Sequence, residues 1–578
     1  MYYKKSISVR YRLLPIFFCL LSMLLVGCDL GFNQTPTVKK LVKAPADKQV
    51  YIVPQVGISD IPTLDPALVM GADQPSMSAV EMIYSGLVGL NDKLEVEPQI
   101  AQSWNVSQDG LSYTFHMRHD VKFSDGTPLT SADVAYSIDR ALQPVTKSTV
   151  APIYLSLIRD SDKLLGGFVP TLVNDSLLTP DANTLVITIR KRAPYFLAML
   201  TYPCSFVVEK RLIDTYKTAF TDHLTEGGST GPFKVSQYTH GKEIDFVPNI
   251  HYYGPPPQLH KVVFPFYQQA ESAYHDYLTG QVDTTGVPVS TFAQDKKRAD
   301  FHQVPQLWIN YYTMNYLAKP FDNIHIRQAF ALAIDKTTIV NGVWKGTVLA
   351  TNHIVPQGMP GYNPNLSGPD GTQSLKGNAT QARALLQMGM KEENITVLPP
   401  IKLTYATSTT FAYFDQEVTA MIKMWNGVLG VTVTPDPIDY NALLTQVTLA
   451  TGNAAGLQFW GLTWVAEYPD PQDWLTRQFD SGVPNNNMNY GQNTSSNVAQ
   501  QQFLQKQLEN ADSNSQQGAR MKTYQQAEQQ LVNDVAWMPM EQVTAIFLRK
   551  ATVIGIVDNA QGMIPPDDWA NIYIGQYV

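Results

Sequence analysis

The sequence predicts an α/β protein built from more than one domain, and three observations support this prediction. At 578 residues the chain is too long for a single hydrophobic core. Its 44% apolar and 16% charged residues are typical of a globular protein. Residues 111–142 have the pattern of strands followed by a capped helix, and residues 401–434 have the pattern strand, helix, strand.

The first pattern lies within residues 98–142. Apolar residues alternate with polar ones in a half-buried strand formed by Leu111, Tyr113, Phe115 and Met117. The turn Asp125-Gly126 follows a second short strand that carries Val121 and Phe123. Thr130 and Asp133 are spaced as the N-cap and third residue of a helix. We therefore expect strand, turn, strand, turn and capped helix.

The second pattern predicts a parallel unit. Residues 401–407 and 431–434 read as strands. Between them, apolar residues recur at helical spacing up to Gly430, which is suited to end a helix. A strand, a helix and a strand in this order predict a parallel α/β unit. Further helices are expected at 326–334 and around Tyr524 to Val535.

The N-terminus predicts a secretory signal peptide over residues 1–27. Four basic residues precede an apolar run, 13–27, that is shorter than the roughly 20 residues needed to span a bilayer. Its end, Leu25-Val26-Gly27-Cys28, resembles the bacterial lipobox, which implies a lipid on Cys28 and cleavage just before it. The alternative is an ordinary secretory signal that ends in cysteine. Residues 28–49 are then the lipidated cysteine and a flexible tether.

Charge and cysteine content argue against nucleic-acid binding and against cysteine-based disulfides or metal sites. Without the four basic residues of the signal segment, which has no acid, the formal net charge of −8 falls by four to −12. A large nucleic-acid interface is therefore not expected. Cys204 is the single cysteine beyond the first 28 residues, so no internal disulfide or cysteine metal cluster is expected. We expect it to pack as a small apolar residue.

Several ordered motifs resemble one family. The runs WNVSQDGLSYTFHMR and FSDGTPLTSADVAYS resemble the signature of bacterial extracellular solute-binding proteins of the peptide and nickel class, the binding subunits of ABC importers. The same order continues with RAPYFLAML, GGSTGPFKV, NIHYYGPPPQLHKVVF, YLTGQVD and PFDNIHIRQAFALAIDK. The resemblance covers residues from about 50 to the C-terminus.

The resemblance implies the architecture. We expect a two-lobed fold like that of the periplasmic binding proteins, type II and of the large peptide-binding class, with an extra subdomain in the first lobe. The expected segments are 50–92, 214–306 and 545–578 for lobe I, 93–213 for the subdomain and 307–544 for lobe II. A hinge would join the two lobes, so that the ligand is bound as they close.

No catalytic or cofactor motif is present. The sequence lacks the G-x-S-x-G elbow, the G-x-x-x-x-G-K-[ST] loop and the H-E-x-x-H helix. His116 and His119 are three residues apart in a strand pattern and so point to opposite faces. We expect no catalysis, no cofactor and no bound metal.

The main candidate site lies in residues 459–475. In peptide-binding relatives a Trp-x-x-Asp-Tyr run supplies the carboxylate that pairs with the ammonium of the peptide, and Glu467 takes that place here, three residues after Trp464. A buried ammonium needs such an anion. The alternative for Glu467 is a surface acid before a turn. Trp460 and Trp464 either line the cleft or pack in the lobe. An arginine that some relatives carry is Gly461 here.

Weaker candidates follow from position in the family. These residues are Asn489 and Tyr490 in lobe II, Tyr154 in the subdomain, and Asp73 and Gln74 in a loop of lobe I. For each of them the alternative is a solvated loop residue.

The predicted function is a lipid-anchored receptor on the outer face of the cytoplasmic membrane. It would capture short peptides and deliver them to an ABC permease and its ATPase, as a monomer. The alternatives are another solute (a nickel chelate, an oligosaccharide, haem or an opine-like compound), a surface chaperone or adhesion protein, and a hydrolase. A neutral sugar would have no need of an anion at Glu467.

Overall fold

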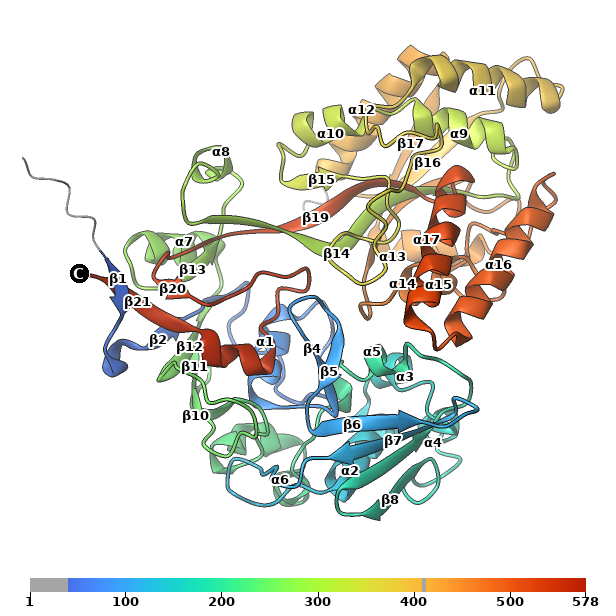
Figure 1. Cartoon of the computed structure of the whole chain (residues 1–578). Coiled ribbons are helices and arrows are strands. Elements are labelled where there is room, and N and C mark those ends of the chain that lie inside the picture. The colour runs from blue at the N-terminus through green and yellow to red at the C-terminus, as the bar shows by residue number, and fades with distance from the viewer. Residues whose placement is uncertain (1–39, 408–411) are drawn as a thin grey trace, which may run out of the picture. The chain divides into compact units, whose positions relative to one another are not determined.

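The computed structural model describes residues 40–407 and 412–578 (Figure 1). The expected signal peptide and Cys28 lie outside the described residues, as does most of the tether. The chain divides into two compact units, residues 1–42 with 576–578 and residues 43–575. In the first unit the backbones of Lys40 and Val578 exchange hydrogen bonds of 3.1 and 3.0 Å. No helix in the described ranges is long and apolar enough to cross a bilayer.

Within residues 43–575, the lobe I sheet combines segments far apart in the sequence. Its order is β10-β11-β12-β2. The first two pairs are antiparallel, and β12 pairs in parallel with both β2 and β3. The strands are β2 (Val50–Ile52), β3 (Gln55–Val56), β10 (Phe233–Thr239), β11 (Glu243–Pro248) and β12 (Lys261–Tyr267). The helices of this lobe are α1 (Gln74–Ile83), α6 (Lys210–Tyr216), α7 (Ala270–Leu278) and α8 (Phe292–Asp295), with the 3-10 segments η1 (Ala46–Lys48), η4 (Lys217–Glu226) and η5 (Pro566–Asn571).

The subdomain has its own antiparallel sheet, in the order β6-β7-β9-β8. The strands are β6 (Ala101–Val106), β7 (Ser112–Met117), β8 (Leu177–Asp181) and β9 (Thr184–Thr188), with the hairpin β4 (Val88–Leu90) and β5 (Val96–Pro98) before them. The helical segments are α2 (Ser131–Leu142), α3 (Ala151–Tyr154), α4 (Ser161–Leu165), α5 (Phe196–Met199), η2 (Pro144–Thr146) and η3 (Pro203–Ser205). Tyr113, Phe115 and Met117 of β7 are buried, which confirms the predicted alternation.

The predicted helix start is confirmed and the predicted second strand is wrong. Thr130 and Asp133 form a capping box at α2, where the Thr130 backbone N–H donates to Asp133 Oδ2 at 2.8 Å. Residues 121–129 form only a tight turn with a single isolated bridge between Lys122 and Pro128. The backbone hydrogen bonds at this bridge, from the N–H of Phe123 to Thr127 and from that of Leu129 to Val121, close a tight turn that leaves too few residues for a strand. Cys204 is buried and unpaired, which confirms its role in packing.

The lobe II sheet has the order β13-β19-β14-β18-β16-β17, and β15 pairs with β19. Its strands are β13 (Thr284–Gly286), β14 (Phe301–Met314), β15 (Val348–Ala350), β16 (Ile401–Ala406), β17 (Val433–Ile438), β18 (Phe459–Val465) and β19 (Met538–Arg549). β16 and β17 are parallel and α12 (Ala412–Leu429) connects them, which confirms the predicted parallel unit. Gly430 ends α12 at a positive φ of 69°, the left-handed conformation that favours glycine.

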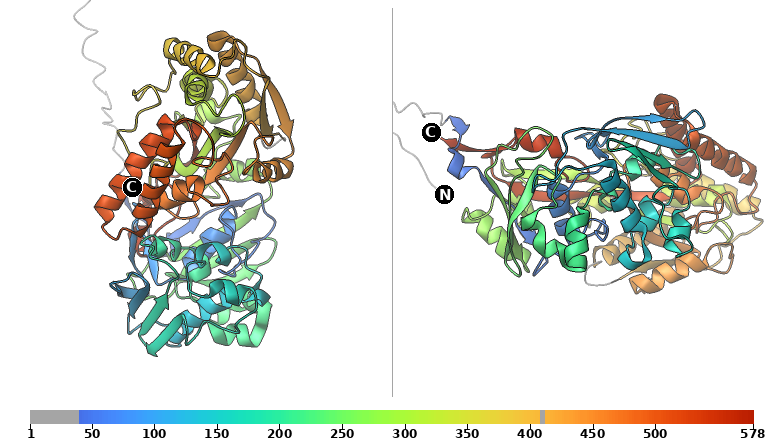
Figure 2. Two further views of the ribbon diagram at one scale, coloured as in Figure 1. Left: turned by 90° about the vertical axis from the view of Figure 1, so that its right-hand side faces the viewer. Right: turned by 90° about the horizontal axis from the view of Figure 1, so that it is seen from below.

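Helices surround this sheet. They are α9 (Ile324–Leu332), α10 (Lys336–Gly342), α11 (Ala379–Glu392), α13 (Tyr440–Leu449), α14 (Pro471–Trp474), α15 (Thr476–Phe479), α16 (Val498–Ser513) and α17 (Gln517–Asn533). The last two lie side by side (Figure 2). The chain ends with β20 (Val553–Ile554) and β21 (Tyr573–Tyr577), and β1 (Leu41–Lys43) lies at its start.

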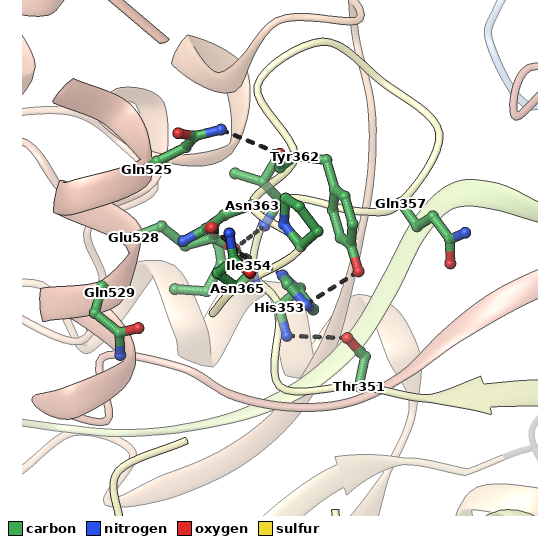
Figure 3. A network of polar contacts seen from close by, with 12 residues as sticks. Thr351, His353, Ile354, Gln357, Tyr362, Asn363, Asn365, Gln525, Glu528 and Gln529 are labelled. Carbon is green, nitrogen blue, oxygen red and sulfur yellow. Dashed lines mark hydrogen bonds and ion pairs between the residues drawn. The ribbon is translucent and has the colours of Figure 1, made fainter. Parts of the chain in front are cut away.

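A buried glutamate holds the loop before α11 onto α17. Glu528, with 0% of its surface exposed, accepts hydrogen bonds from the backbone N–H groups of Ile354 and Val355, at 3.0 and 2.9 Å. Tyr362 contacts His353 at 3.1 Å, and its carbonyl accepts a hydrogen bond from Gln525 of α17 (Figure 3). The loop is therefore part of the rigid wall of lobe II.

The strands β14 and β19 run beside each other between the two lobes (Figure 1). The N-terminal half of β14 pairs only with β19, whereas Trp308–Met314 also pairs with β18 of lobe II. The expected lobe boundaries at 306–307 and 544–545 fall inside these strands. Residues 43–575 form one compact unit, so the expected segment boundaries remain predictions.

Two carboxyl groups meet between these strands and α12. Glu417 accepts a hydrogen bond from the Tyr312 hydroxyl at 2.8 Å, and Glu541 accepts one from Asn310 at 3.3 Å. Burial raises the pKa of Glu541 well above its usual value, and the Glu417 carboxylate raises it further, while Lys336 opposes the shift. Because the folded-state pKa lies above the unfolded one, the stabilisation is complete below the unfolded pKa and is lost as the pH rises.

We expect the Glu541→Gln variant, which keeps the neutral form, to lose this pH dependence. The natural chain should lose stability as the pH rises, so the free energy of unfolding of the variant minus that of the natural chain should grow by about 1–3 kcal/mol between about pH 5 and about pH 8. Denaturant unfolding across this range measures the difference. Glu271→Gln on α7, an exposed carboxylate, is the control and should show no such trend. Parallel profiles for all three proteins would contradict the assignment.

Candidate functional site

A cavity of about 630 Å³ is lined by segments from both lobes and the subdomain. Lobe I contributes α1 and residues 85–86, and the subdomain contributes β4, Tyr154 and residues 201–203. The connecting strands contribute residues 306–308 and 543–545, and lobe II contributes residues 465–467 at the end of β18. Clefts of this size between lobes are typical of small-ligand sites.

Glu467 lies where β18 ends and its carboxylate is half-buried. Its Oε2 accepts a hydrogen bond from the Tyr154 hydroxyl at 2.7 Å. The bond joins lobe II to the subdomain across the cleft. Burial, followed by the Glu467 charge, raises the pKa of Tyr154 far above its usual value, so the hydroxyl remains a donor at neutral pH.

Tyr154 is itself held by an aromatic partner. Its ring stacks on Tyr202 with centroids 3.6 Å apart and an interplanar angle of 11°. The Tyr202 hydroxyl donates to the carbonyl of Val69 at 2.9 Å. The stacked pair therefore forms a rigid aromatic wall beside the Glu467 carboxylate.

A second acid, Asp473, fixes the backbone of Glu467. Asp473 is completely buried, and its Oδ2 accepts from the Glu467 backbone N–H at 3.0 Å and from Trp464 Nε1 at 3.1 Å. Its Oδ1 pairs with Arg477 at 2.9 Å. Burial raises the pKa of Asp473 to about 7, while Arg477 opposes the shift. These contacts orient the Glu467 side chain toward the cavity.

The loop after Glu467 is fixed by a buried ion pair. Arg520 of α17 binds both carboxylate oxygens of Asp470, at 2.7 and 2.5 Å, and both side chains are almost fully buried. The Asp470 carboxylate also caps α14 by accepting from the backbone N–H of Gln472. The two ends of residues 467–470 are therefore held by separate buried acids.

The floor of the cavity is a bulge in β14. The register with β19 shifts between Pro305 and Ile309, and residues 306–308 line the cavity there. The side chain of Gln542 donates to the carbonyls of Gln306 and Gln357, both at 2.8 Å. Gln542 thereby connects the bulge to the loop that Glu528 holds on α17.

The ionisable side chains of the lining, apart from tyrosines, are acidic. Among the described residues that line the cavity, Glu81 and Glu467 are the carboxylates and no lysine, arginine or histidine is present. An uncompensated carboxylate in a partly desolvated cleft favours a cationic ligand group over an anionic one.

Three of the residues expected from the sequence line this cavity together, namely Glu467, Tyr154 and Gln74. Gln74 starts α1 and donates a hydrogen bond to the carbonyl of Gly71 at 3.0 Å. Trp464 lies directly behind Glu467 through their shared acceptor Asp473, and Arg477 lies over its ring.

The other expected residues lie outside the lining. Trp460 has 1% of its surface exposed and packs in the hydrophobic core of lobe II, which is the second of the two alternatives for it. Asn489 and Tyr490 are fully buried and bond to Asn315 and Asp534. Asp73 caps α1 by accepting from the Ser76 backbone N–H at 3.2 Å. None of these four lines the cavity in the described structure.

Sequence reasoning missed several lining residues, above all Glu81, Tyr202 and Trp308. Glu81 interrupts an otherwise apolar segment of α1, and that was the available signal. Tyr202 and Trp308 had none, because a tertiary stack and a strand bulge bring them to the cavity.

Comparison with known proteins now identifies the class. The family model of the bacterial extracellular solute-binding proteins, family 5 (middle region), matches residues 95–486. The match covers more than half of the chain, so the chain belongs to this family of solute-binding proteins. This confirms the resemblance of the sequence motifs.

Individual relatives agree with this assignment. The chain is similar to the dipeptide-binding protein DppE of Bacillus subtilis, with 27% identity over 530 residues that cover 90% of this chain and 92% of DppE. It is also similar to heme-binding protein A of Haemophilus influenzae, with 26% identity over 86% of this chain and 88% of that protein. The solved structure of the periplasmic murein tripeptide-binding protein MppA, in its unliganded open form, has 25% identity and a TM-score of 0.78, covering 93% of this chain and 99% of MppA. The expected two-lobed α/β fold is thereby confirmed.

We expect the Tyr154→Phe variant to be less stable than Tyr202→Phe. Each change removes one hydroxyl from the same stacked pair. The Tyr154 hydroxyl bonds to a carboxylate, so its loss should cost about 1.5–3 kcal/mol of stability. The Tyr202 hydroxyl bonds to a neutral carbonyl, so its loss should cost about 0.5–1.5 kcal/mol. Denaturant unfolding of the unliganded protein measures both. Equal losses would show that the contact of Tyr154 with Glu467 is not charge-assisted.

We expect Arg520→Met to lower the free energy of unfolding by about 3–5 kcal/mol, because it leaves Asp470 buried without its cation. Lys506→Met is the matched control. Lys506 pairs with Glu509 on the exposed surface of α16, where solvent screens the pair, so its loss should have little effect on stability. Thermal or denaturant unfolding compares the two variants. A small loss for Arg520→Met would show that the pair does not hold the loop.

Proposed function

We propose that the protein is the peptide-binding subunit of an ABC importer and that it captures short peptides between its two lobes. The Glu467 carboxylate carries this proposal. It lines the cavity, is held there by Tyr154 and Asp473, and stands where the sequence resemblance implies the anion for the peptide ammonium. The free amino group of a peptide is the complementary cation.

The support from Asp473 explains how the pairing would be strong. An ion pair gains most when its charged groups are already oriented, because less side-chain freedom is lost on binding. Glu467 has one methylene more than aspartate, and the Tyr154 hydroxyl and the Asp473 carboxylate hold its two ends. The longer side chain is therefore held at its carboxylate and at its backbone N–H.

Delivery and anchoring belong to the same proposal. The bound peptide would pass to a membrane permease, and ATP would be hydrolysed by a separate subunit. A lipid on Cys28 would hold the protein on the outer face of the cytoplasmic membrane, with residues 28–49 as the tether. The receptor would act as a monomer whose lobes, with the boundaries predicted above, close over the peptide.

Other solutes are the alternative within the family. One relative is named for haem, and the fold serves several ligand classes. A half-buried anion at Glu467 favours a ligand with an amino group over a neutral sugar or a dianionic haem. This charge preference places peptides first.

The test is calorimetry on the full chain in a mild detergent. The panel holds di- to hexapeptides, their N-acetylated copies, sugars, haem and nickel. We expect peptides to bind, N-acetylation to weaken binding about 30-fold or more, and Glu467→Gln to abolish that difference. Glu271→Gln on α7, which lies outside the cavity, is the matched control and should bind as the natural chain does.

Two results would contradict this proposal. Binding of sugar, haem or nickel without binding of any peptide would overturn the peptide assignment. Equal affinity for free and acetylated peptides would show that Glu467 does not pair with the ammonium.

A further inference from the structure

A second, smaller cavity of about 230 Å³ adjoins the cleft on the side of lobe I. The two cavities share lining residues, namely Ser78, Glu81, Gln306, Ala545, Gly562 and Met563. They are therefore contiguous, and a group that enters the cleft has access to the side cavity past these residues.

The shared boundary contains one acidic group, Glu81, near the end of α1. Among the residues that the structure describes, none forms a hydrogen bond or an ion pair with the Glu81 carboxylate. Its side chain is half-buried. The Glu81 oxygens are not among the buried atoms that lack a partner, so the carboxyl group is accessible to a ligand group that enters either cavity.

The walls around Glu81 are suited to an alkyl chain. Phe264, Ile564 and Trp569 line the side cavity, and Met563 lies at the boundary. The side cavity has two further charged residues, Arg549 and Asp558, and they neutralise each other. Arg549 donates to both oxygens of Asp558, at 2.7 and 3.1 Å. An apolar wall with one free carboxylate matches a side chain that has an aliphatic stem and a cationic end.

We propose that Glu81 and the side cavity form a specificity subsite for a basic side chain of the ligand, lysine or arginine. This inference rests on the proposed peptide-binding function and adds a preference to it. Glu467 would take the peptide ammonium and Glu81 a second positive charge. The receptor would therefore select peptides of net positive charge, since the described lining of the cleft offers no basic side chain to an acidic residue.

The protonation of Glu81 supplies an independent readout. Burial raises the pKa of Glu81 to about 8, so the empty subsite is mostly protonated at neutral pH. Apart from tyrosines, the other ionisable groups that line the two cavities are Glu467, Arg549 and Asp558. A cation that binds at Glu81 stabilises the carboxylate, so binding should release a proton into the buffer.

The experiment is calorimetry on the full chain with trialanine derivatives. Lysine, norleucine or glutamate replaces each position in turn, and the titrations are repeated in two buffers that differ in ionisation enthalpy. At one position we expect lysine to bind about tenfold to a hundredfold more tightly than norleucine, and glutamate more weakly than both. Only the lysine peptide should release a proton.

Two variants separate this subsite from the amino-group site. Glu81→Gln keeps the shape of the side chain and should remove both the lysine preference and the proton release, while N-acetylation still weakens binding. Glu467→Gln should do the reverse. The melting temperature of each unliganded variant verifies that it is folded. If Glu81→Gln does not fold, Glu81→Ala, with a shorter side chain, takes its place in the same titrations.

The outcomes are distinguishable. Peptides that bind with equal affinity for lysine and norleucine at every position overturn the subsite and leave the proposed function standing. A lysine preference that survives in Glu81→Gln also overturns it. If no peptide binds, the proposed function fails and the subsite fails with it.

Discussion

The candidate site depends on one physical requirement. A carboxylate in a partly desolvated cleft needs hydrogen-bond donors or a cation. At Glu467 the protein provides one donor, the Tyr154 hydroxyl, and fixes the backbone through Asp473. At Glu81 it provides none within the described chain. Uncompensated charge in such a place is costly, and a cationic ligand removes the cost. In the proposed function, the two acids therefore set which ligands the cleft prefers.

Buried acids hold the segment around Glu467, Asp473 through partners close in the sequence and Asp470 through a distant helix. Asp473 joins the end of β18 to Arg477, and Asp470 joins the next residues to α17. Glu528 holds the loop 351–366 on the same helix. Through Gln542 that loop is tied to the bulge of β14 at the floor of the cleft. The lobe II side of the site is thus one connected polar network within a hydrophobic core.

Local patterns in the sequence were enough to predict much of the fold. The alternation in β7, the capping box of α2 and the glycine that ends α12 were all readable, because each depends on neighbours in the chain. The short strand at Val121 and Phe123 was predicted wrongly, since apolar alternation does not show that the chain turns back immediately between Phe123 and Thr127. Family motifs supplied the two-lobed architecture, which local periodicity does not encode.

The candidate site was only partly predictable for the same reason. Glu467 could be found because a tryptophan at fixed spacing precedes it, and Tyr154 and Gln74 because of their place in the family. Asn489 and Tyr490 look like exposed loop residues in the sequence, yet their side chains are fully buried by contacts with Asn315 and Asp534. Glu81 lies on a helix whose neighbouring apolar residues predict a place in the hydrophobic core. Its exposure to two cavities follows from tertiary packing, which no local pattern reveals.

The most direct measurement is identification of the ligand that the protein retains from its own cell. The full chain would be purified without denaturation, examined by native mass spectrometry, and its ligands released and sequenced. We expect short peptides with free amino groups, enriched in lysine or arginine. Release of neutral sugars, haem or acidic peptides would contradict a cleft whose specificity is set by Glu467 and Glu81.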